Sequence, residues 1–331
     1  MLYSIHRMAA VGLLWSCAVQ SSWACATCGC TLSADAAMGY SSEPGWRVNL
    51  EYDYLNQDQL RHGTRSVTGV PEGNELEHDT VNQYFTADLN YNPNADWNID
   101  LKVPYVVRTH STYGEFDASQ PLPDRSYSRS SSLGDIKIIA SYQGFLEARN
   151  LGVQLGVKLP TGHYGTAVNF SGGPMAGTPL DASLQPGTGS TDVIVGAYYY
   201  RAISDNFDII ANGQFQSALK EKLNQPGNDF RPGNSVSMSV GLRYDAHPKW
   251  VPQLQLNVLH KSSDQGALAD LPDTVGTVLY LSPGLAARVL PKLFVYGFAQ
   301  LPVYSNLDGY QLFPRFTLSV GLSYAFGSTE P

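Results

Sequence analysis

Hydrophobic and polar residues alternate with a period of two along much of the chain. In residues 46–54 every even position is aromatic or aliphatic, and every odd position is Arg, Asn, Glu or Asp. In residues 316–326 large apolar residues alternate in the same way with small ones. Successive side chains of a β-strand point to opposite faces. The pattern therefore predicts strands with one face suited to hydrocarbon and one face suited to water.

The same alternation recurs often enough to predict about twelve strands, most of them near the ~9–11 residues that a tilted membrane strand needs. Further segments span 84–91, 97–105, 134–143, 151–159, 191–203, 207–219, 236–244, 253–258, 275–289 and 293–303. Short connections at 92–96, 144–150, 204–206, 246–249 and 290–292 alternate with long polar ones at 61–77, 109–132, 161–190, 220–234, 262–274 and 304–314.

Alternating short and long connections are typical of outer-membrane barrels, whose short turns are periplasmic. We therefore predict an all-β fold: a transmembrane antiparallel up-and-down β-barrel with both termini in the periplasm. A soluble β-sandwich also alternates, but its strands are usually shorter, about 5–6 residues. Composition favours the barrel, because charged residues are 15% of the chain and aromatics 11%, with a mean hydropathy of -0.18. Soluble domains average about 25% charged residues.

The sequence divides into four predicted segments. Residues 1–24 resemble a cleaved signal peptide, with Arg7 before a short apolar core and small residues at Ser22 and Ala24. Residues 25–44 form a periplasmic segment with cysteines, 45–326 the barrel and 327–331 a tail. Residues 318–326 resemble the terminal signal read by the barrel-assembly machinery. We expect a bacterial outer-membrane protein that contacts the lipid bilayer and lipopolysaccharide. The net charge of -8, without a basic cluster, argues against nucleic acid.

Three short pieces in the middle of the chain resemble motifs of a known family. They are Leu133-Gly134-Asp135-Ile136, Leu159-Pro160-Thr161-Gly162, and the run Gly187 to Asp192. The chain resembles a broad family of outer-membrane barrels named for a meta-pathway of phenol degradation. The resemblance implies a barrel that acts as a passive or substrate-facilitating channel. It implies no catalytic residues and no particular solute.

A cluster of thiols follows the predicted cleavage site. Cys25, Cys28 and Cys30 are the only cysteines after residue 24. They could bind a soft metal ion such as Cu or Zn, with Asp35, Met38 or Tyr40 as additional ligands. They could also form one disulfide and leave one free thiol, and Cys25 could be lipidated. A metal or redox site would serve either to gate a channel or to anchor a periplasmic partner to a non-conducting barrel.

Charged residues on the polar face of the strands are the candidate pore-lining residues, since fixed charge controls which ions pass. Mixed signs allow two interpretations: a pore for a small solute, or charges that pair across the interior and fill it. No nucleophile motif accompanies the histidines, so we do not expect an enzyme. The candidate pore-lining residues are Arg47, Glu51, Asp53, Asp88, Asp100, Lys102, Lys137, Lys158, Asp208 and Arg243.

Overall fold

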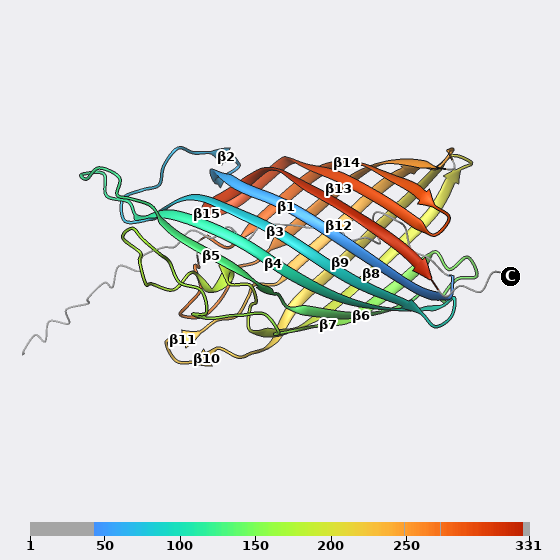
Figure 1. The fold of residues 1–331 in the computed structure, drawn as a ribbon, viewed down its shortest axis with the longest axis horizontal. Coiled ribbons are helices and arrows are strands. Elements are labelled where there is room, and N and C mark those ends of the chain that lie inside the picture. The colour runs from blue at the N-terminus through green and yellow to red at the C-terminus, as the bar shows by residue number, and fades with distance from the viewer. Residues whose placement is uncertain (1–42, 248, 272, 327–331) are drawn as a thin grey trace, which may run out of the picture.

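In the computed structural model, which describes residues 43–247, 249–271 and 273–326, the alternating segments pair in sequence order into a closed antiparallel sheet (Figure 1). The ring runs β15-β14-β13-β12-β9-β8-β7-β6-β4-β3-β1 and closes where β1 pairs with β15. The short strand β5 pairs with β4 beside β6, and β2 pairs with β1. The ring strands are β1 (Gly45–Gly63), β3 (Glu75–Asn92), β4 (Trp97–Glu115), β6 (Ile136–Tyr142), β7 (Leu151–Leu159), β8 (Ser190–Ser204), β9 (Phe207–Glu221), β12 (Ser235–Tyr244), β13 (Trp250–Lys261), β14 (Gly276–Leu290) and β15 (Leu293–Phe326).

The last element, β15, crosses the wall twice. Residues 293–307 pair with β14, and residues 307–326 pair with β1. The chain reverses at Asp308-Gly309, where Gly309 has φ of 60°, a conformation that glycine adopts without steric cost. The described wall therefore consists of twelve antiparallel passes, and the predicted barrel of about twelve strands is confirmed. The long loop predicted at 304–314 is wrong, because these residues continue the two strands up to a tight hairpin.

Short and long connections lie at opposite ends of the barrel (Figure 1). All five short turns fall where they were predicted, and we call that end the short-turn end. The opposite, long-loop end carries the remaining elements: β2 (Arg65–Ser66), β5 (Ser126–Leu133), the 3-10 helix η1 (Ala182–Leu184), β10 (Asn224–Gln225) and β11 (Asn228–Asp229).

Two predicted loops are shorter than expected. Strand β4 continues to Glu115, β5 begins at Ser126 and β3 begins at Glu75, so the loops predicted at 109–132 and 61–77 are partly strand. The physical reason is that these ends extend past the apolar part of the wall. Neither face there needs hydrocarbon, so the alternation that identifies a strand disappears.

The two faces of the wall differ as the alternation predicted. In the final pass Phe316, Leu318 and Val320 are exposed on the outside, whereas Thr317 and Ser319 between them are buried. Aromatic pairs mark the short-turn end, as in the girdles of membrane barrels. The ring centroids of Trp46 and Tyr91 are 4.3 Å apart, and other pairs are Trp97 with Tyr142 and Phe207 with Tyr244. No helix in the described ranges is long and apolar enough to cross a membrane.

Candidate functional site

The ten candidate pore-lining residues all lie on the inner face of the wall, opposite the exposed apolar side chains. Four of the five acidic ones accept hydrogen bonds from side chains of other strands. Asp88 accepts hydrogen bonds from Asn49 and from Lys102, whose Nζ is 2.9 Å away. Three more carboxylates accept hydrogen bonds, Glu51 from Tyr296 at 2.7 Å, Asp53 from Ser319, and Asp100 from Asn90.

Three of the basic residues, Lys102, Lys137 and Lys158, also contact polar side chains. Lys137 Nζ donates to Gln216 Oε1 at 3.1 Å, and Arg243 lies directly opposite Asp208 on β9. Asp53, Asp88 and Asp100 are each at most 3% exposed. Many of these charged groups thus contact polar side chains of the same inner face. Whether a continuous pore runs past them remains a prediction.

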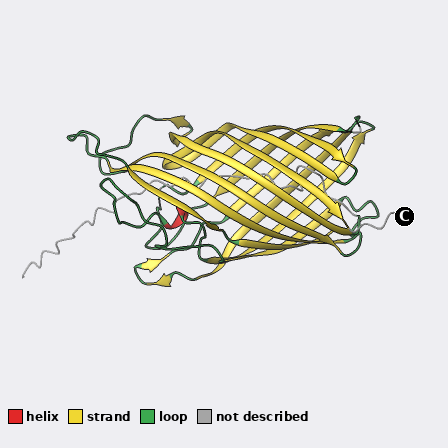
Figure 2. Cartoon of the chain, in the orientation of Figure 1, coloured by secondary structure: helices red, strands yellow, loops and turns green. Residues whose placement is uncertain are grey.

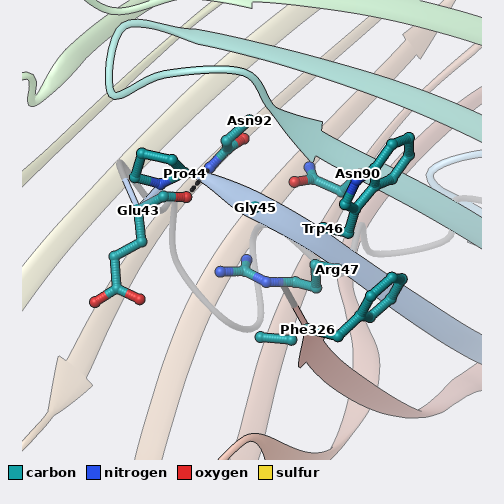
Figure 3. Close-up of a pocket in the computed structure, with 9 residues that line it drawn as sticks. Glu43, Pro44, Gly45, Trp46, Arg47, Asn90, Asn92 and Phe326 are labelled. Atoms are coloured by element: carbon teal, nitrogen blue, oxygen red, sulfur yellow. Dashed lines mark hydrogen bonds between the residues drawn. The ribbon is translucent and has the colours of Figure 1, made fainter. Parts of the chain in front are cut away.

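Arg47 lines a small, open hollow at the short-turn end, beside the seam where β1 pairs with β15 (Figure 3). Asn92 Nδ2 donates to the carbonyl of Glu43 at 2.9 Å and ties the start of the described chain to β3. The predicted thiol site at Cys25, Cys28 and Cys30, together with Asp35, Met38 and Tyr40, lies outside the described residues. The other side chains around the hollow are Pro44, Trp46, Asn90, Ala325 and Phe326, with Gly45.

The three family-like motifs meet in space at the long-loop end. Asp135 accepts hydrogen bonds from the backbone N–H groups of Gly162 at 3.1 Å and Thr188 at 3.0 Å. Lys158 Nζ lies 3.3 Å from Asp135 Oδ2 and 2.9 Å from Asp192 Oδ2. One buried lysine and two buried carboxylates therefore join both ends of the loop formed by residues 160–189 to the wall. We call this arrangement the latch.

The remaining motif residues complete the latch. Thr161 Oγ1 donates to the carbonyl of Gly134 at 2.8 Å and accepts from the N–H of Ile136 at 2.9 Å. A Cβ atom on Gly162 would lie 2.8 Å from the Cα of Gly187, closer than side chains tolerate. Glycine is required at this position because two backbones approach each other there. Sequence reasoning had identified these residues only by resemblance.

The loop 160–189 folds into the long-loop end of the barrel, where Figure 2 shows η1 among the loops. Arg108, on the inner face of β4, donates to the carbonyl of Leu184, and its Nη1 lies 3.4 Å from the carbonyl oxygen of Gln185. The same guanidinium also donates to Asn82 and Tyr84 on β3. A side chain of the wall thus holds the loop inside the barrel. We call residues 160–189 the plug.

Apolar packing also holds the plug against the wall. Leu184 is fully buried, and Phe170 and Leu180 of the plug pack with it in one cluster. The wall and the neighbouring loop contribute Leu60, Leu312 and Val70 to that cluster. Burial of such side chains stabilises by about 1.5–3 kcal/mol each. Neither Arg108 nor the plug was identified from the sequence, because a loop's length does not tell which way it folds.

A second feature missed by sequence reasoning is a group of acidic residues beside the plug. Burial is the main cause that raises the pKa of Asp270, to about 10, and repulsion from Asp273 and Asp181 adds to it. Burial raises the pKa of Asp273 to about 7, and burial with repulsion from Glu75 raises that of Asp181 well above its ordinary value. The spacing of Glu75 and Glu77 by two positions could have indicated that they share one face of a strand, but both were placed in the loop predicted at 61–77.

These raised pKa values predict that the plug loosens as pH rises. The buried acids bind protons more tightly when the plug is closed than when it is open. The free energy that favours the closed plug therefore falls as pH rises and the acids of the open plug ionise. For Asp273 that loss begins near the ordinary value of 3.8 and is complete above about 7. Amide exchange in residues 164–186 of the plug and in the peptide that carries Asp273, corrected for intrinsic rates, should quicken across this range. Peptides of β8 and β9 serve as the control, and protection that increases with pH would contradict the expectation.

Comparison with solved structures places the fold among outer-membrane barrels. An outer membrane channel from Pseudomonas putida F1 superposes with a TM-score of 0.62 at 14% identity, covering 89% of this chain and 100% of that one. The CymD monoaromatic hydrocarbon channel (TM-score 0.47, 11% identity, 89% and 93% covered) and the Ralstonia pickettii toluene transporter TbuX (0.44, 9%, 86% and 90%) are more distant. No curated protein sequence matches the chain.

At these identities the superposition shows the fold alone. A match to a family over more than half of the chain also shows which family the chain belongs to. The family described as "Putative MetA-pathway of phenol degradation" matches residues 104–306. That range is more than half of the 331 residues and contains all three motifs of the latch. The predicted resemblance is therefore confirmed, and the chain belongs to this family, with the fold of an outer-membrane β-barrel.

Proposed function

We propose that the protein is an outer-membrane channel for a small solute, closed at its extracellular end by the plug in the described state. The observation that carries the proposal is the plug itself, which is fastened by Arg108 and the latch to a wall with a polar inner face. A barrel that served only as an anchor would have no use for a separately attached loop inside its mouth. The short-turn end and both termini are assigned to the periplasm, as in other such barrels.

The polar inner face also limits the solute. Glutamine and tyrosine side chains hydrogen-bond to one another across strands, as Gln214 does to Gln154 and Tyr198 to Gln143. These groups can exchange partners with a solute that carries its own donors and acceptors. We propose a small solute with hydrogen-bonding groups, moved without chemical change, in a barrel surrounded by lipid and lipopolysaccharide.

Recordings from single channels test the proposal. Mature protein, residues 25–331, in a planar bilayer should give discrete, brief and small conductance steps, because the plug closes the mouth most of the time. Folding is checked by the shift in gel mobility on heating. The channel proposal would be contradicted if the folded protein gives no conductance steps, both as wild type and after removal of the plug.

We further propose that Cys25, Cys28 and Cys30 form a metal or redox site on the periplasmic side. Support comes from β1, which begins at Gly45 at the short-turn end, so the preceding segment joins the barrel there. The same recordings with Zn(II) or Cu(I) should show altered opening that disappears when all three cysteines are replaced by serine. Metal sensitivity that survives these substitutions would exclude the site.

A further inference from the structure

The strand β5 has one edge without a neighbouring strand. Its other edge pairs with β4 along its whole length, from Ser126 to Leu133. The strand β6, which follows β5 in the chain, pairs with β4 nearer the short-turn end and then with β7. Within the described residues, the free edge of β5 pairs with the plug at one backbone bridge, between Tyr127 and Ser171. Strand β5 is therefore a wall strand whose second partner is nearly missing.

The bridge shows which backbone groups of β5 point to the free edge. The N–H of Tyr127 donates to the carbonyl of Ser171 at 2.9 Å, and the N–H of Ser171 donates back at 2.6 Å. Backbone groups of an antiparallel strand point to alternate sides, so those of Arg129 and Ser131 point the same way as those of Tyr127. Both residues are exposed, and the described chain offers their backbone groups no partner on this side. Such an edge pairs readily with another strand.

The plug carries a matching free edge on residues 167–171, which form one half of a short antiparallel ribbon. Residues 177–180 are the other half, and the N–H of Phe170 donates to the carbonyl of Thr178 at 2.9 Å. Backbone groups of Phe170 thus point to residues 177–180. By the same alternation, those of its neighbour Asn169 point the opposite way, toward β5.

The side chains of this half of the ribbon already alternate as they do in a wall strand. Phe170 is buried, and Val168 packs against the apolar cluster to which Phe170 belongs. Positions 167, 169 and 171 between and beside them are exposed. The segment could therefore join the wall without turning its apolar side chains toward water.

The attachments of the plug limit how it can move. The latch holds both of its ends, at Gly162 and Thr188, and the bridge to Tyr127 holds the ribbon. A loop held at three places cannot swing out into solvent as a hinged lid does. The remaining attachments are the hydrogen bond from Arg108 to the carbonyl of Leu184 and the apolar packing. Their loss leaves the ribbon free to move only toward β5.

We propose that the plug opens by moving sideways, so that residues 167–171 pair with the free edge of β5 as an additional strand of the wall. In the register of the existing bridge, Asn169 lies opposite Arg129 and Ala167 opposite Ser131. Each pair adds two backbone hydrogen bonds, which offset part of what is lost when the plug leaves the mouth. These bonds use backbone atoms, so the side chain of Arg129 has no part in them. The inference rests on the proposed channel function, because it describes how the same plug opens.

Residue-resolved amide exchange in lipid nanodiscs, corrected for intrinsic rates, compares wild type with Arg108→Leu, which releases the plug. In the released protein the N–H groups of Ser131 and Asn169 should exchange several-fold more slowly, since they gain partners. The N–H of Leu184, which donates to the carbonyl of Asp181 at 3.0 Å, should exchange faster. The inference is overturned if Ser131 and Asn169 exchange as fast as in wild type or faster. Leu184→Ala releases the plug through loss of packing, in case Arg108→Leu does not fold.

Single-channel recordings give a second test, through a proline on the free edge. Ser131→Pro removes an N–H that would donate to Ala167 in the open state, and proline is tolerated on the free side of an edge strand. Added to Arg108→Leu, it should shorten the open periods several-fold. Leu122→Pro, at an exposed position between two prolines of the loop before β5, is the matched control and should leave them unchanged. Equal open periods with and without Ser131→Pro would contradict the sideways movement.

The two measurements separate this inference from the proposed function. If the protein gives no conductance steps but the exchange of Ser131 and Asn169 still slows, the channel proposal fails and the pairing with β5 stands. If the protein conducts and the exchange of these two amides does not slow, the channel proposal stands and the pairing fails.

Discussion

Replacing residues 164–186 with a Gly-Ser turn should convert a mostly closed barrel into one with frequent and several-fold larger conductance steps. The excised segment contains Leu184 and the other apolar side chains that fill the mouth. The N–H of Gly187 donates to the carbonyl of His163 at 2.7 Å, so the two cut ends already lie side by side. The latch residues Asp135, Lys158 and Thr188 stay in place. Planar-bilayer recordings measure the change.

A matched variant separates opening of the plug from general damage. Arg108→Leu removes the hydrogen bonds from the wall to the carbonyls of Leu184 and Gln185 but keeps the whole loop. It should lengthen the open periods without increasing the step size. Arg129→Leu, at an exposed position on β5, should leave both quantities unchanged. Conductance of the excised variant equal to that of wild type would show that the plug does not limit flow.

Lys158→Met should cost about 3–5 kcal/mol of unfolding free energy, the usual effect of removing one partner from a buried ion pair. Lys158 is 4% exposed and lies between Asp135 and Asp192, both also buried. Methionine has nearly the same length, so the loss is one of charge rather than of volume. Urea unfolding in lipid vesicles, followed by tryptophan fluorescence, gives the measurement.

The control for this prediction uses a lysine of β9, two strands away from β7 in the wall. Lys220→Met, at an exposed position of β9, should change stability by less than about 0.5 kcal/mol. Adding Asp192→Asn to Lys158→Met should restore part of the loss, because one of the two uncompensated charges is removed. If Lys158→Met is as stable as the control, the latch does not stabilise the barrel.

The sequence by itself was sufficient for the wall. A membrane strand must have one apolar face, so alternation reveals both the strand and the direction of each side chain, as in residues 46–54 and 316–326. Short turns were located for the same reason, since they interrupt the pattern only briefly. Prediction failed at 304–314 and within 109–132, where the strands leave the apolar layer and their two faces become chemically alike.

The latch was only partly predictable from the sequence. Its motifs could be recognised by resemblance, but the reason for them could not. Asp135 and Thr188 are 53 positions apart in the chain, and neither shows locally that the other is its partner. The local sequence explains only that glycine permits a close approach. The structure shows which two backbones approach each other.

What the sequence determined is therefore the barrel: its strands, its turns and the polar character of its inner face, all consequences of a periodic constraint along the chain. What only the tertiary structure decided is the state of the mouth. The plug is built from a loop that carries no periodic signal, and Leu60 of β1 and Leu312 of β15 meet beside it through the closure of the barrel rather than through proximity in the chain. A loop's composition is compatible with both solvent and interior, and packing against Leu60 and Arg108 selects the interior.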